Sequence, residues 1–255
     1  MRLAFFKYQG TGNDFIMIDG RRNTVKFSAN KISSLCNRRF GIGADGLIIL
    51  KEEKGVDFLM DYYNADGSQS FCGNGSRCAQ AFAQKLGMIE NESRFKAIDG
   101  IHEGKIEGSS FATKMGNVAK IERVGSDYFI HTGSPHYIKY VKNVDDVDVE
   151  SEGRAIRNSA PFVEEGTNVN FVSVAEDHLK VRTYERGVEG ETLSCGTGVT
   201  AVAISFLQQM NSTQQAVNIA TKGGNLRVEL TRKDNNSFEN IWLVGPAKFV
   251  FSGEI

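Results

Sequence analysis

The sequence SCGTGVTA at residues 194–201 decides the fold prediction, because nearly the same pattern, FCGNGSRCA, occurs at residues 71–79. In each stretch a cysteine precedes a Gly-x-Gly turn, and small and apolar residues follow. The two cysteines, Cys72 and Cys195, are 123 positions apart (195 minus 72). Two such stretches indicate an internal duplication, in which each half of the chain contains one helix that begins at its cysteine.

Helical and strand-like patterns are spread along the whole chain. The predicted helices cover residues 28–39, 73–86, 150–158 and 196–210, with Ser28 as the cap of the first. The predicted strands cover residues 1–8, 14–19, 45–50, 57–64, 127–133, 169–174, 178–185, 226–230 and 240–245. Small residues on all sides of the two long helices indicate that each is enclosed by its own sheet. We therefore predict an α+β fold of two pseudo-symmetric halves, each a mainly antiparallel or mixed β-sheet wrapped around a central helix.

The seam between the halves is predicted near Met115 to Val118, where no low-complexity linker occurs. The first half then covers residues 1–116 and the second covers residues 117–246. We expect the C-terminal stretch 247–255 to return to the first half as a strand. An active site is expected in a cleft between the halves, with one helix start contributed by each.

Composition excludes several classes of partner. The 30 basic and 31 acidic residues of the 255-residue chain give a net charge of -1, so no basic excess attracts nucleic acid or anionic lipid. Residues 1–15 lack the apolar core of a secretory signal, and no apolar run approaches the roughly 20 residues of a membrane helix. We expect a cytoplasmic protein that binds neither nucleic acid nor membrane.

The four cysteines are expected to be thiols, as is usual in a reducing compartment. Cys72 and Cys78 have five residues between them, whereas zinc sites have roughly two to four, so no metal site is predicted. Cys36 and Cys78 lie inside predicted helices and are interpreted as structural.

A cysteine at the start of a helix has a distinct chemistry. Unpaired N–H groups and the positive end of the helix dipole favour the thiolate, which makes the sulfur a better base or nucleophile. Neighbouring glycines allow the backbone N–H groups to approach and hold a carboxylate. A single such motif is more often a buried turn around an apolar cysteine. The presence of two copies favours the functional interpretation.

A symmetric pair of thiols suits the inversion of a stereocentre beside a carboxylate. One thiolate removes the α-proton from one face, and one thiol returns a proton to the opposite face. The helix N–H groups stabilise the charge that builds on the carboxylate meanwhile. The predicted ligand is a small-molecule amino acid.

The chain also resembles the diaminopimelate epimerase family in motifs that run in family order. These are GTGNDF (10–15), RRFGIGADGLI (38–48), NADGS (64–68), CGNGSRC (72–78), SPH (134–136), TNVNF (167–171), YERGVEGET (184–192) and SCGTG (194–198). The resemblance implies interconversion of LL- and meso-diaminopimelate, in lysine and peptidoglycan precursor synthesis. It also implies no pyridoxal phosphate or other cofactor, no metal, and a homodimer.

The same resemblance assigns roles to individual residues. It implies that the catalytic residues are Cys72 and Cys195, as acid-base thiols, with His136 and Glu185 assisting them. The positions expected to hold the reacting carboxylate are Gly73, Asn74, Gly196 and Thr197. The positions expected to line the pocket or hold the distal end of the substrate are Asn13, Asn64, Asn168 and Arg186.

Three departures from the family pattern fall at positions of substrate recognition. Ser134 replaces the asparagine that usually precedes the Pro-His pair. The stretch from Asn64 to Cys72 is one residue shorter than usual, and that from Glu185 to Cys195 is one residue longer.

Two alternatives remain open from the sequence. One is a related racemase of another amino acid, such as histidine. The other belongs to a different class, a thiol redox switch or binding protein in which Cys72 and Cys195 form a reversible disulfide. Without a functional role, Glu185 and Arg186 would form a surface ion pair, and Asn13, Asn64 and Asn168 would be turn residues.

Overall fold

The computed structural model describes residues 3–21, 26–233 and 236–255. Residues 1 and 2 of the predicted strand 1–8 lie outside the described residues. The chain divides into two units, of which one comprises Met1–Thr113 and Gly245–Ile255 and the other Lys114–Val244. The C-terminal segment thus belongs to the first unit, where its strand pairs antiparallel with the first strand of the chain.

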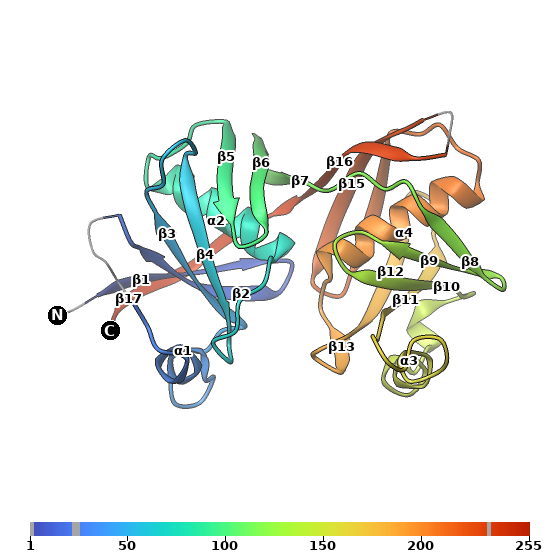
Figure 1. Ribbon diagram of the computed structural model, residues 1–255, viewed down its shortest axis with the longest axis horizontal. Coiled ribbons are helices and arrows are strands. Elements are labelled where there is room, and N and C mark those ends of the chain that lie inside the picture. The colour runs from blue at the N-terminus through green and yellow to red at the C-terminus, as the bar shows by residue number, and fades with distance from the viewer. Residues whose placement is uncertain (1–2, 22–25, 234–235) are drawn as a thin grey trace. The chain divides into compact units, whose positions relative to one another are not determined.

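The described part of the first unit is a mixed β-sheet with two helices (Figure 1). Its elements are β1 (Ala4–Gly10), β2 (Asn13–Asp19), α1 (Ala29–Cys36), β3 (Gly46–Lys51), β4 (Phe58–Asn64), α2 (Gly73–Lys85), β5 (Glu92–Ala97), β6 (Gly100–Glu107), β7 (Ser110–Lys114) and β17 (Lys248–Glu254). The pairs β1–β2, β3–β4, β5–β6 and β6–β7 are antiparallel. The pairs β2–β3 and β4–β5 are parallel. β17 lies on the other side of β1.

The second unit has a similar set of elements. These are β8 (Ile121–Val124), β9 (Asp127–His131), β10 (Pro135–Tyr140), the 3-10 helix η1 (Val144–Asp146), α3 (Val149–Arg157), β11 (Asn168–Val174), β12 (Leu179–Glu185), β13 (Gly190–Thr192), α4 (Gly196–Gln209), β14 (Ala216–Thr221), β15 (Gly224–Arg232) and β16 (Phe238–Pro246). The pairings β9–β10, β10–β11, β11–β12, β12–β14, β14–β15 and β15–β16 repeat the same order of antiparallel and parallel senses.

The order of helices repeats as well. α1 follows β2 as α3 follows β10, and α2 lies between the parallel strands β4 and β5 as α4 lies between β12 and β14. This repeated topology confirms the predicted α+β fold with an internal duplication.

The two long helices are enclosed, as the sequence predicted. Residues 74–83 of α2 are all buried, and α2 packs on β1, β2, β3 and β4. Residues 198–205 of α4 are likewise buried, against β9, β10, β11, β14 and β15. The alanines and glycines among these buried residues allow the strands to approach each helix closely.

The predicted helix 28–39 is wrong at its end, since α1 stops at Cys36. Ser28 caps it as predicted, accepting a hydrogen bond from the Lys31 amide at 3.3 Å. At the other end, the Asn37 side chain accepts hydrogen bonds from the amides of Arg39 and Phe40, both at 2.9 Å. Asparagine commonly replaces helical hydrogen bonds with such a local turn.

None of the helices in the described part of the chain combines the length and the apolar composition needed to cross a membrane.

Candidate active site

Cys72 is the residue immediately before α2. Its backbone is extended, with φ of -133°, and its sulfur accepts a hydrogen bond from the Gly75 amide at 3.3 Å. The sulfur also lies 3.5 Å from the side-chain oxygen of Asn13. Asn74 donates to that same oxygen at 3.4 Å. Thus Cys72, Gly73, Asn74 and Asn13 come together at the start of α2.

Asn13 is held by its turn and by a carboxylate. Thr11 and Gly12 have φ of 50° and 83°, the left-handed pair that a two-residue hairpin turn requires between β1 and β2. The Asn13 amide nitrogen donates to Asp45 Oδ2 at 2.6 Å. Because a carboxylate only accepts, this bond turns the carbonyl oxygen of Asn13 toward Cys72.

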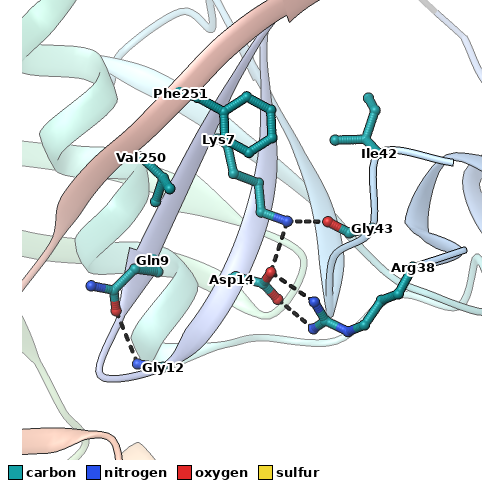
Figure 2. A pocket seen from close by; sticks show the side chains of 9 residues that line it. All are labelled: Lys7, Gln9, Gly12, Asp14, Arg38, Ile42, Gly43, Val250 and Phe251. Atoms are coloured by element: carbon teal, nitrogen blue, oxygen red, sulfur yellow. Dashed lines mark hydrogen bonds and ion pairs between the residues drawn. The ribbon is translucent and has the colours of Figure 1, made fainter.

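Asp45 belongs to an ion network that borders a pocket of about 360 Å³. Arg38 joins Asp45 to Asp14, each at 2.7 Å. Figure 2 shows Asp14 between Arg38 and Lys7, whose Nζ lies 2.7 Å from the Asp14 carboxylate. Burial raises the pKa of Asp14, but hydrogen bonds from Arg38 and Lys7 outweigh it and hold that pKa at about 2. The pocket is lined by Lys7, Gln9, Gly12, Asp14, Arg38, Ile42, Gly43, Val250 and Phe251. None of these is a predicted site residue. The ion network contacts the predicted site through Asp45, which accepts the hydrogen bond from the Asn13 side chain.

Asn64 is the last residue of β4. Its side-chain oxygen accepts a hydrogen bond from the Tyr62 hydroxyl at 2.8 Å, and its amide donates to Ser68 at 3.0 Å and Ser70 at 3.3 Å. These bonds hold Asn64 within the loop that leads to Cys72.

A buried arginine lies one turn into α2. Arg77 is fully buried and donates to Asn74 Oδ1 at 2.9 Å and to Thr11 at 3.3 Å. Burial lowers its pKa to about 10, so it stays a cation at neutral pH. Its charge adds to that of the helix dipole close to Cys72.

The two cysteines interpreted as structural are buried in apolar surroundings. Burial raises the pKa of Cys36 to about 11, and it raises that of Cys78 still further. Both remain protonated at neutral pH and are poor nucleophiles.

Cys195 is the residue immediately before α4, as Cys72 is before α2. It is extended, with φ of -118°, and nine-tenths buried. Its sulfur lies 3.5 Å from the hydroxyl of Thr197, and that hydroxyl lies 2.8 Å from Nε2 of His136. The Thr132 hydroxyl donates to the Thr197 carbonyl at 2.8 Å, which fixes this first turn. Cys195, Gly196, Thr197 and His136 therefore form a second cluster.

His136 projects from β10 and is fully buried. Its Nδ1 lies 3.1 Å from the side-chain nitrogen of Asn170 on the parallel strand β11. Burial lowers the pKa of His136 to about 3, with smaller contributions from His131 and Arg186. The imidazole is neutral at physiological pH.

Asn168 connects two positions expected to recognise the distal end of the substrate. Its side-chain oxygen accepts a hydrogen bond from the Arg186 amide at 2.9 Å. Its nitrogen donates to the Ser134 hydroxyl and to the Pro135 carbonyl, both at 2.9 Å. Ser134, which replaces the usual asparagine of the family, is thus tied to Asn168.

Glu185 and Arg186 lie at the end of β12. Glu185 Oε2 accepts a hydrogen bond from the Thr192 hydroxyl at 3.0 Å, and Arg186 donates to the Glu165 carbonyl at 2.7 Å.

Asn170 was not predicted as a site residue, although the motif TNVNF at residues 167–171 contains a signal for it. Asn168 and Asn170 are two positions apart on one strand and therefore face the same side. His136 is opposite Asn168 in the pairing of β10 with β11. Among the described residues, no three or more His, Cys, Asp or Glu residues gather as metal ligands would.

Comparisons with known proteins identify the family of this chain. The family model described as diaminopimelate epimerase matches residues 5–121 and 128–250. The diaminopimelate epimerase of Flavobacterium psychrophilum is 47% identical over 99% of this chain and 100% of its own length. That of Chlorobaculum tepidum is 40% identical over 96% of this chain and 98% of its own.

Solved structures show the same fold at low sequence identity. A PhzF-family phenazine biosynthesis protein of Bacillus anthracis superposes with a TM-score of 0.79 at 14% identity, covering 100% of this chain and 99% of that one. A hydroxyproline epimerase from Agrobacterium vitis gives a TM-score of 0.71 at 13% identity, covering 100% and 92%. The family match and the identity of the full-length relatives decide the assignment: this chain belongs to the diaminopimelate epimerase family.

Proposed function

We propose that this protein interconverts LL- and meso-diaminopimelate by transferring protons through two cysteines. The observation that carries the proposal is the repeated placement of Cys72 and Cys195, each directly before the enclosed helix of its unit. The reaction belongs to lysine and peptidoglycan precursor synthesis, as the family does.

The proposed step balances as a simple proton exchange. The thiolate of one cysteine removes the α-proton, so an S–H bond forms and the electron pair stays on carbon. The thiol of the other cysteine then gives its proton to the opposite face and becomes a thiolate. In the reverse direction the two cysteines exchange roles. The proposal requires both thiols to reach one α-carbon.

Stabilisation of the carbanion is assigned to the backbone N–H groups at the two helix starts. Gly73 and Asn74 contribute on the Cys72 side, and Gly196 and Thr197 on the Cys195 side. Fixed N–H donors of this kind lower the energy of charge that develops in the transition state. General acid-base transfer adds roughly 100- to 10,000-fold to the rate. Arg77 supports the helix start at Cys72 with a buried positive charge.

The remaining predicted residues receive supporting or recognition roles. We assign His136 and Glu185 to assisting the thiols, and Asn13 and Asn64 to lining the pocket. Arg186 suits the distal carboxylate of the substrate, because its guanidinium binds carboxylates with two parallel hydrogen bonds. Asn168 holds Arg186 and Ser134 in place.

We also propose that the enzyme is a homodimer and acts in the cytoplasm. Val250 and Phe251 on β17 are 53% and 45% exposed and line the same pocket, an apolar surface suited to a second copy. Sedimentation velocity should give a dimer for the wild type and a monomer for Val250→Lys; a monomeric wild type contradicts the proposal.

A reducing compartment is assigned because both catalytic cysteines must remain thiols.

The substrate is tested by incubating the wild-type enzyme with LL-diaminopimelate in heavy water. The expected product is meso-diaminopimelate that carries solvent deuterium at the inverted α-carbon. Exchange at the α-carbon of histidine, with none into diaminopimelate, would instead identify a racemase of another amino acid.

A further inference from the structure

A chain of buried polar side chains ends at the sulfur of Cys195. Thr183 on β12 donates to Asn170 Oδ1 at 3.0 Å, and Asn170 Nδ2 contacts His136 Nδ1 at 3.1 Å. His136 Nε2 then contacts the Thr197 hydroxyl at 2.8 Å, and that hydroxyl lies 3.5 Å from Cys195 Sγ. Thr183, Asn170 and His136 are at most 3% exposed, so water does not compete for these bonds.

The orientation of the Asn170 amide is fixed by its other neighbours. Asn170 Nδ2 also lies 3.1 Å from the Tyr137 backbone carbonyl, which only accepts hydrogen bonds. The opposite end of the amide faces the Thr183 hydroxyl. The group that faces His136 is therefore the NH₂ of Asn170.

This orientation determines where His136 carries its proton. Because Asn170 donates to Nδ1, that nitrogen is the acceptor and the proton of the neutral ring is on Nε2. Nε2 donates to the Thr197 oxygen, so the proton of the Thr197 hydroxyl is left to point at Cys195 Sγ.

Gly198 provides the room for this arrangement. A Cβ at this position would lie 2.5 Å from Asn170 Oδ1 and 3.3 Å from His136 Cε1. Only glycine lets Asn170 approach the first turn of α4 this closely.

We propose that Asn170 is a positioning residue for proton transfer at Cys195: it holds His136 in the Nε2–H form, which directs the Thr197 hydroxyl proton to the sulfur. The inference rests on the proposed function, since it concerns the base strength of a thiol assigned there. The Thr197 hydroxyl stabilises the thiolate before it takes the α-proton. Asn170, His136 and Thr197 keep their own protons throughout.

The first test reads the tautomer directly in the wild-type protein. Nitrogen NMR of the ¹⁵N-labelled protein at neutral pH should show the His136 ring with hydrogen on Nε2 and none on Nδ1. The signals are assigned by their loss in His136→Gln. A wild-type ring with its proton on Nδ1 would overturn the proposal, whatever the variants do.

The second test reverses the hydrogen bond with the near-isosteric Asn170→Asp. A carboxylate only accepts, so the His136 proton should move to Nδ1 and the Thr197 hydroxyl should turn toward Nε2. We expect alkylation of Cys195 by iodoacetamide at neutral pH, measured in a Cys72→Ser background, to slow by about tenfold. Asn218→Asp makes the same change at an exposed position of β14 and should leave the rate unchanged.

A double-mutant cycle separates the hydrogen-bond chain from the added charge. If the hydrogen-bond chain acts on Cys195, Asn170→Asp should slow alkylation much less in the Thr197→Val background than in the protein that keeps Thr197. Equal slowing in both backgrounds would mean that the charge acts through space and would contradict the proposal. The alkylation and NMR measurements need no substrate. A wild type that does not act on diaminopimelate would therefore contradict the proposed function, whereas the role of Asn170 is judged by these two measurements alone.

Discussion

Nε2 of His136 lies 2.8 Å from the hydroxyl oxygen of Thr197, the second residue of α4. The contact joins a strand residue to the helix start that carries Cys195. It places the Thr197 side chain, in addition to its backbone N–H, among the groups that we propose to act at Cys195.

Replacing Thr197 tests the value of this hydroxyl. Thr197→Val keeps the shape and the backbone N–H but removes the hydrogen-bond donor to Cys195. We expect kcat to fall by about 100-fold, the lower range for loss of acid-base assistance, with a much smaller change in KM. The matched variant Thr197→Ser keeps the hydroxyl and should retain most activity. Equal kcat values for the two variants would show that the hydroxyl has no role.

Burial of His136 makes stability depend on pH. The pKa of the folded residue is about 3, against roughly 6.5 in an unfolded chain. Between these values the unfolded state binds the extra proton, so this contribution to stability is complete above about pH 6.5 and is lost as the pH falls toward 3.

The measurement is the urea midpoint at neutral pH and near pH 5.5 for wild type and His136→Gln. The loss of stability on acidification should be smaller in the variant than in the wild type. His178→Gln, at a partly exposed turn, is the control and should keep the wild-type loss. An unchanged pH dependence in His136→Gln would place the titrating group elsewhere.

Close packing of α3 on β12 gives a prediction about stability. A Cβ at Gly153 would lie 2.4 Å from Cβ and 2.6 Å from Cγ of Tyr184, a fully buried side chain. Gly153→Ala should therefore destabilise the protein by about 1–3 kcal/mol through overpacking, although alanine favours helix. Gly116 has no atom within 4 Å of an added Cβ, so Gly116→Ala should have little effect. Similar urea midpoints for these two variants would contradict the packing argument.

The sequence predicted the helices better than the strands. The starts of α2 and α4 were clear because a cysteine, two glycines and a run of small residues mark each one. The strands β5, β6, β7, β8, β10, β13 and β14 were not predicted. β5 shows the reason, since its buried positions are Ser93, Phe95 and Ala97, which give weak alternation. Only Phe95 is a large apolar residue on this side, and the Ser93 hydroxyl contacts the side chain of Gln80 of α2.

The site residues were predicted by motif, whereas their partners were not. Asn170 and His136 are 34 positions apart, and they meet only because β10 and β11 pair in parallel. The parallel register of two strands separated by a helix is not visible in local periodicity. For the same reason the chain from Arg38 through Asp45 to Asn13 could not be predicted, since it joins a loop to a hairpin.

The most direct test of the two-thiol proposal is deuterium exchange at the α-carbon in wild type, Cys72→Ser and Cys195→Ser, started from LL- and from meso-diaminopimelate. We expect the wild type to interconvert the isomers and each serine variant to lose epimerisation, with residual exchange that depends on the starting isomer. Wild-type epimerisation by either variant, or by enzyme with both thiols blocked, would contradict it.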